Sequence, residues 1–369
     1  PLLMMVQKAY RILPACCILI IQALFSFKYT ARYFPDAYIP SSWALILCTA
    51  FLLWYSPKSK MIFEKYAFFG AVIGVLLATV LILKYIPIET LNVDRWSVIS
   101  SFWDAAFAGE YPYAAKSHMD NPPGPMPFYF CLALPFYLGL DFGWIAALGV
   151  IIWLFWWWKK DFSRGLVISL LMLLSLGLWW EVASRSNVFF NATLIVFLIY
   201  SWLNTGFNTK KHLWLAIATG LLLSTRLVFI IPLSFAFIYL WKSQVQHRIK
   251  LYTSALITAS TFALTFLPFL WIFPDQFWVM NPFIVQGEYL MPSSLTIGCV
   301  IACLVVGLRI KTKEQVLWAG GVGLFGTIMV YLGFHLSQES WNVCLHQSGV
   351  DISYFLLSLP FLMYSALKN

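Results

Sequence analysis

Four ionisable side chains gather in the short stretch NVDRWSVISSFWDAAFAGEYPY, which directly follows a long apolar run. They are Asp94, Arg95, Asp104 and Glu110. A carboxylate beside a reacting hydroxyl can accept its proton, which accelerates such a step roughly 10²–10⁴-fold. Asp94 lies where the apolar run ends, near the expected depth of the membrane surface, and we predict that it is a general base.

Two arginines are candidates for binding a phosphate group. Arg185 and Arg226 each lie near the expected outer end of an apolar segment. The guanidinium fork can bond a phosphate bidentately, and fixed positive charge stabilises a phosphate that leaves. Structural roles remain open for all three residues: Asp94 could cap a helix or pair with Arg95, Arg185 could pair with Glu181, and Arg226 could reach lipid headgroups.

A second set of side chains could contact an acceptor or support the residues above. It consists of Tyr113, His118, Glu181, Asp120 and Glu288. Solvation in a loop is the competing interpretation for His118, Asp120 and Glu288. We expect no metal site and no cofactor, although a divalent metal remains an alternative that the sequence does not indicate.

The composition predicts the elements that must position these residues. Apolar residues make up 61% of the 369-residue chain and charged residues 11%, and the mean hydropathy is +0.79. Soluble domains have roughly 45–50% apolar and about 25% charged residues. We therefore predict an all-α, polytopic membrane protein that forms a single transmembrane domain over residues 1–369.

The apolar runs predict about 12 membrane crossings. They lie near residues 12–28, 42–56, 66–86, 142–158, 164–180, 188–204, 213–225, 227–242, 250–272, 294–309, 316–335 and 351–367. The run from His212 to Trp241 would be about 45 Å long as one helix, too long for a roughly 30 Å bilayer core. We therefore predict a hairpin with Arg226 at its outer turn.

The distribution of basic residues predicts the orientation. Lysines and arginines concentrate between the predicted crossings on one side, for example at Lys159-Lys160 and Lys210-Lys211, whereas acids predominate on the other. By the positive-inside rule, both termini then lie in the cytoplasm. We expect a multi-pass protein of a bacterial inner (plasma) membrane, without nucleic acid as a partner.

The long connections are predicted on the outer side, at residues 87–125, 273–293 and 336–350. The first of them carries most of the candidate residues. Residues 87–140 are predicted to form an external loop with two interfacial helices, one starting at Asp94 and one over 126–140. Gly109 ends the first helix, and the sequence HMDNPPGPMPFYF leads the chain back to the membrane through a rigid, proline-rich segment.

The loop resembles the first external loop of the GT-C class of membrane glycosyltransferases. The likeness rests on Asp94 just past an apolar run, the interfacial helix, GEYPY (residues 109–113) and the PPGP return. SRSN (184–187), GLLLSTR (220–226) and DISYFLLSLPF (351–361) resemble later parts of such enzymes, whereas residues 12–56 have no obvious counterpart. The resemblance covers about two thirds of the chain.

This resemblance implies an enzyme of the cell envelope, similar to bacterial mannosyltransferases. It would transfer a sugar from a polyprenyl-phosphate donor to a hydroxyl of a glycan, lipid or protein acceptor on the outer, periplasmic face. Many members have two adjacent acids at the start of the loop, whereas here Arg95 follows Asp94. The alternative is a transporter or lipid flippase without chemistry, which would show a central cavity open to both sides.

Overall fold

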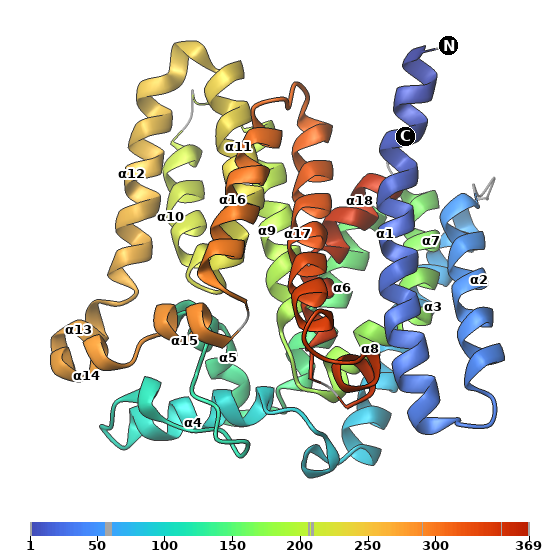
Figure 1. The fold of residues 1–369 in the computed structure, drawn as a ribbon. Helices are drawn as coiled ribbons and strands as arrows, with labels where there is room; N and C mark the ends of the chain where they lie inside the picture. Colours follow the sequence, from blue (N-terminus) through green and yellow to red (C-terminus); the bar gives the residue numbers. More distant parts are fainter. Residues whose placement is uncertain are drawn as a thin grey trace. The chain divides into compact units, whose positions relative to one another are not determined.

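The helices of the computed structural model follow the apolar runs of the sequence (Figure 1). The model describes residues 2–55, 61–205, 207, 210–289, 291–347 and 349–367, without the side chains of residues 2–9, 61–64, 162 and 287–289. The chain folds into two compact units. It passes between them after residues 92, 142, 193 and 331, so the units are not successive along the sequence.

Unit 1 combines the N-terminal, central and C-terminal segments of the chain, namely residues 1–92, 143–193 and 332–369. Its elements are α1 (Leu2–Tyr33), α2 (Tyr38–Trp54), α3 (Met61–Tyr85), η1 (Ile88–Thr90), α6 (Gly143–Lys160), α7 (Phe162–Leu174), α8 (Leu176–Ala183), the start of α9 (Val188–Asn204), the end of α17 (Lys313–Leu336), η5 (Asn342–His346), η6 (Ile352–Leu357) and α18 (Leu359–Leu367). Helix α1 packs against α2 and α18, while α3, α6 and α7 pack against one another.

Unit 2 contains residues 93–142 and 194–331, and it carries residues 93–140 of the predicted external loop. Its elements are α4 (Arg95–Phe107), η2 (Pro112–Ala114), α5 (Pro127–Gly139), the rest of α9, α10 (Lys211–Leu223), η3 (Leu227–Phe229), α11 (Ile230–Ser243), η4 (Val245–His247), α12 (Arg248–Leu264), α13 (Leu267–Ile272), α14 (Pro274–Val279), α15 (Pro282–Tyr289), α16 (Ser293–Gly307) and most of α17. Helices α10 and α12 pack together, as do α11 and α16.

A glycine allows α10 and α12 to approach closely. A Cβ atom on Gly220 would lie 2.5 Å from the carbonyl oxygen of Thr258 and 2.7 Å from Cβ of Thr261. Small residues are typical where two helices in a membrane come into backbone contact. The end of α10, which leads to Arg226, is therefore held against α12.

Several helix boundaries confirm the predictions made from the sequence. The run from His212 to Trp241 breaks after Leu223, and Arg226 has an extended backbone before α11 begins. The first external helix spans Arg95–Phe107, and Gly109 follows it with a φ of 74°, a left-handed conformation that glycine adopts readily. Pro127 occupies the first turn of α5, where a missing N–H costs nothing.

Three predicted crossings are interrupted, and one predicted loop is helical. The run 351–367 is divided at Ser358 into the 3₁₀ helix η6 and α18. The run 164–180 is split at Ser175 into α7 and α8, which are bent by 60°. The run 250–272 is split after Leu264 into α12 and α13, because Pro268 in the first turn of α13 has no N–H to continue the ladder of α12. Residues 274–289, expected as a loop, form α14 and α15.

Within the described residues, three helices are long and apolar enough to span a membrane. They cover Tyr10–Tyr33, Lys65–Tyr85 and Lys313–Leu336, and up to six spans result if each of three bent helix pairs counts as one. The all-helical architecture with candidate membrane spans agrees with the sequence-based expectation. Twelve crossings stay a prediction.

Candidate functional site

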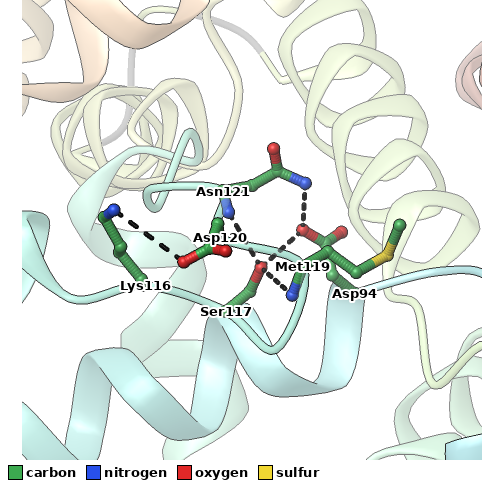
Figure 2. A network of polar contacts seen from close by, with 6 residues as sticks. All are labelled: Asp94, Lys116, Ser117, Met119, Asp120 and Asn121. Atoms are coloured by element: carbon green, nitrogen blue, oxygen red, sulfur yellow. Dashed lines mark hydrogen bonds and ion pairs between the residues drawn. The ribbon is translucent and has the colours of Figure 1, made fainter.

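A short loop after η2 closes on itself and forms one side of the candidate site (Figure 2). Ser117 N–H donates to the carbonyl oxygen of Asn121 at 3.0 Å, and Asp120 N–H donates to that of Ser117 at 3.0 Å. Asp120 has a φ of 62°, a left-handed conformation that Asp and Asn tolerate better than most residues. Pro122 and Pro123 follow at once and fix the backbone after the loop.

The carboxylate of Asp94 points into this loop and is held by two side chains (Figure 2). Ser117 Oγ donates to Asp94 Oδ2 at 2.8 Å, and Asn121 Nδ2 donates to the same oxygen at 2.7 Å. Ser117 Oγ in turn accepts from the backbone N–H groups of Met119 and Asn121 at 3.3 and 3.2 Å. The loop therefore orients the carboxylate through one of its two oxygens.

The structure contradicts the alternative that the Asp94 side chain caps the first external helix. Asp94 occupies the N-cap position of α4, but its side chain makes no capping hydrogen bond. Only its backbone takes part, because its carbonyl oxygen accepts from Val98 N at 2.8 Å and from Ser97 Oγ at 3.0 Å. The donors at 117 and 121 hold the carboxylate away from the helix end.

His118 lies beside Asp94 in the loop but binds a different partner. Its Nδ1 is 2.6 Å from Ser97 Oγ, and its ring stacks on Trp96 with centroids 5.1 Å apart. These contacts attach the loop to the first turn of α4. His118 therefore supports the position of the loop, while its exposed edge stays accessible.

Asp120 and Tyr113 have opposite environments. The Asp120 side chain is 89% exposed and forms an ion pair with Lys116 at 3.8 Å, as expected for a solvated loop residue. Tyr113 is fully buried, donates from its hydroxyl to the carbonyl oxygen of Pro125 at 3.2 Å, and packs against Phe102 and Phe269. Burial raises the pKa of Tyr113 well above its ordinary value, so this phenol stays protonated and supports the proline-rich return.

Arg226 belongs to the same unit as Asp94. Its guanidinium lies over the ring of Tyr129 in α5, with Cζ 5.3 Å from the ring centroid. The backbone N–H groups of Met126 and Phe128 donate to the carbonyl oxygens of Thr225 and Ser224 at 3.3 and 2.9 Å. The end of the predicted external loop is thus joined to the turn that carries Arg226.

Residues of the connection 273–293 also contact the predicted external loop. Gln286 Nε2 of α15 donates to the carbonyl oxygen of Gly124 at 2.6 Å, and the Tyr111 hydroxyl donates to that of Met280. Glu288 lies in α15 as well, but its side chain falls outside the described part of the structure. In unit 2 the two connections predicted on the outer side, 87–125 and 273–293, therefore meet.

Arg185 and Glu181 lie in unit 1 and are both buried, with 3% and 0% exposure. Arg185 Nη1 donates to the carbonyl oxygens of Ala183 and Ile86 at 2.6 and 3.1 Å, and the latter follows the end of α3. Glu181 Oε2 accepts from Phe189 N at 2.9 Å in the first turn of α9. Both side chains thus satisfy backbone groups at helix ends. Phosphate binding by Arg185 stays a prediction.

Sequence reasoning missed Ser97, Ser117 and Asn121, the residues that orient Asp94 and His118. Serine and asparagine are frequent in turns for local reasons, so the sequence SHMDN indicates a turn without indicating its partner. Within the described residues, no group of three or more His, Cys, Asp or Glu side chains could hold a metal ion.

Unit 2 contains the carboxylate of Asp94, which two side chains hold, and the guanidinium of Arg226, which lies over the ring of Tyr129. It also contains the proline-rich segment, which hydrogen bonds from other residues hold in place. A fixed carboxylate can accept a proton from a hydroxyl, and a guanidinium can bind an anionic group. Comparison of the chain with protein-family models, with curated proteins and with solved structures gave no match.

Proposed function

We propose that this protein is a GT-C-like membrane glycosyltransferase that uses a polyprenyl-phosphate sugar as its donor. In the proposed reaction an acceptor hydroxyl oxygen attacks the anomeric carbon, the bond from that carbon to the phosphate oxygen breaks, and polyprenyl phosphate leaves. The observation that carries the proposal is the carboxylate of Asp94, held through Oδ2 by Ser117 and Asn121.

Asp94 takes the hydroxyl proton in this mechanism. Both donor side chains bind Oδ2, and among the described residues this leaves Oδ1 to face an acceptor. A base that is already oriented loses little further freedom when the acceptor arrives, which favours proton transfer. The braced loop supports this role because it holds the carboxylate independently of any ligand.

Arg226 binds the phosphate of the donor, with Arg185 as the second candidate. The planar guanidinium matches two phosphate oxygens, and its stacking on Tyr129 restricts its orientation. Fixed positive charge at the leaving group stabilises the transition state without a general acid. Arg226 is the stronger candidate, because it lies in the same unit as Asp94, whereas Arg185 donates to backbone carbonyl oxygens in unit 1.

The proposal includes twelve crossings, cytoplasmic termini and a site on the periplasmic face of a bacterial inner membrane. A Lys116→Cys substitution in an otherwise cysteine-free protein tests this topology, because the Lys116 side chain is 66% exposed. We expect an impermeant thiol reagent to label it in intact cells. A cysteine at Lys159, on the predicted cytoplasmic side, is the control and should react only after permeabilisation; the reverse pattern would overturn the orientation.

The chemical test is transfer of labelled sugar by the purified protein. A panel of polyprenyl-phosphate sugars, supplied with a mixture of glycan, lipid and peptide acceptors, should yield a labelled product with at least one donor. The same sugars on nucleotides should yield none. Transport of lipid across vesicles without transfer of label would instead favour the flippase alternative.

A further inference from the structure

An open cavity of about 760 Å³ lies at the other end of α4 from Asp94. It is formed by the C-terminal half of α4, the segment 108–115 and the residues Phe273 and Gln276 at the start of α14. Ligand sites in proteins have volumes of roughly 300–1,000 Å³. The cavity is therefore large enough for a small molecule or for one end of a larger one.

The lining combines hydrogen-bond acceptors with aromatic rings. Asp104, Glu110 and Gln276 supply two carboxylates and a carboxamide, while Tyr111 and Phe273 supply rings whose centroids are 5.4 Å apart. The Tyr111 hydroxyl already donates to the carbonyl oxygen of Met280. None of the described residues that line the cavity is basic, so an anionic ligand would be repelled.

The carboxylates are arranged to accept hydrogen bonds from a ligand. Asp104 Oδ1 accepts from the Tyr137 hydroxyl at 2.5 Å, which fixes the carboxylate. Glu110 follows Gly109 and is exposed. Ionised acceptors form hydrogen bonds about twice as strong as neutral ones, and an aromatic wall adds apolar contact area. A ring compound with hydroxyl groups at its edge and an apolar face matches both features. Its hydroxyls can donate to the carboxylates, and its apolar face can pack on the aromatic wall.

The cavity is on the same face of α4 as the candidate base. Asp94, Ser97, Ser101, Asp104 and Ala108 recur at steps of three and four residues, which places them on one side of a helix. Asp94 and Asp104 are ten positions apart, or roughly 15 Å along the axis. Ser97 on this face is buried and bonded to His118, so a ligand seated in the cavity would have to extend past the His118 ring to bring a hydroxyl to Asp94.

We infer that this cavity binds a neutral, hydroxyl-rich saccharide, which is the non-reacting part of the acceptor. The inference rests on the proposed glycosyl transfer and specifies its acceptor as a carbohydrate several rings long. Asp104 and Glu110 bind ring hydroxyls, and Phe273, which packs on the buried Tyr111, contacts the apolar face of a ring. Small side chains such as that of Ala108 leave the space for it.

The test is binding of the purified full-length protein to an array of neutral, amine-bearing and acidic oligosaccharides. We expect neutral members to bind. Asp104→Asn and Glu110→Gln should each weaken this binding about tenfold, and Ala108→Trp, which fills the cavity, should abolish it. Asp275→Asn and Phe107→Trp are the matched controls, because both residues are exposed neighbours that do not line the cavity, and both should bind normally.

Three results would overturn the inference: no binding to any member, binding that Ala108→Trp leaves intact, or a preference for amine-bearing members that Glu110→Gln removes. Binding of the donor lipid is measured on the same samples. If the protein binds saccharides but neither binds the donor lipid nor transfers sugar, the proposed glycosyl transfer is refuted. The assignment of a saccharide to the cavity would still hold. Donor use with no saccharide binding would refute the cavity alone.

Discussion

Asp94→Asn is expected to lower the turnover number for sugar transfer by about 10²-fold or more, with little change in donor-lipid binding. Asparagine keeps an oxygen that can accept from Ser117 and Asn121, which hold the carboxylate at 2.8 and 2.7 Å in the native protein. It cannot take up the proton of an acceptor hydroxyl, and loss of a general base costs roughly 10²–10⁴ in rate. The measurement is single-turnover transfer, with donor-lipid affinity determined in parallel.

Asp104→Asn is the matched comparison because Asp104 lies on the same face of α4. It should raise the KM for the acceptor and leave the turnover number within a few-fold of the native value, since Asp104 lines the cavity and not the reacting bond. Equal losses of turnover in both variants, or near-normal turnover in Asp94→Asn, would show that the base lies elsewhere. Asp120 and Glu288 would then be the next candidates.

Arg226→Lys is expected to weaken donor-lipid binding about tenfold, and Arg226→Ala to weaken it further. Lysine retains the positive charge but loses the planar fork that bonds two phosphate oxygens, and it also loses the stacking of the guanidinium on Tyr129. Hydrogen bonds to charged groups contribute about 1.5–3 kcal/mol each, so the loss of one corresponds to a tenfold change or more. Titration of the purified protein with a labelled donor lipid measures the effect.

The control is another arginine of unit 2 with a similar aromatic contact. Arg248 lies over the ring of Trp241 at 4.6 Å, at the beginning of α12, on the side that the charge distribution places in the cytoplasm. Arg248→Lys should leave donor affinity unchanged. If both lysine variants bind donor as the native protein does, Arg226 only anchors its hairpin at the membrane surface.

Much of the local structure was predictable because it depends on residues close together in the chain. The apolar runs predicted most helices to within a few residues, and the glycine at 109 and the proline at 127 marked the end of α4 and the start of α5. The length of the run around Arg226 alone required a break, since one helix would exceed the bilayer core. Val98, Phe102 and Ala105 recur at helical spacing in the sequence, and they lie on the buried face of α4.

The interruptions in the apolar runs were harder to predict. Ser175 ends α7 within a stretch whose composition suits one continuous helix, and Thr265 follows the end of α12 three residues before Pro268. The hydroxyl of Thr265 contacts Ser224 Oγ at 2.8 Å, a contact between residues far apart in the sequence. Hydropathy reports how favourable burial is along a segment, whereas such a contact depends on which neighbour the segment meets.

The sequence by itself determined the all-helical class with candidate membrane spans, the approximate positions of the helices, and the location of Asp94 and Arg226 near the ends of apolar segments. Only the tertiary structure decided what those charges contact. Asp94 faces Ser117 and Asn121 rather than its own helix, Arg226 stacks on Tyr129, and Arg185 is committed to backbone carbonyls. Helix formation follows from local periodicity and burial, whereas the partner of a side chain depends on how distant segments fold onto one another.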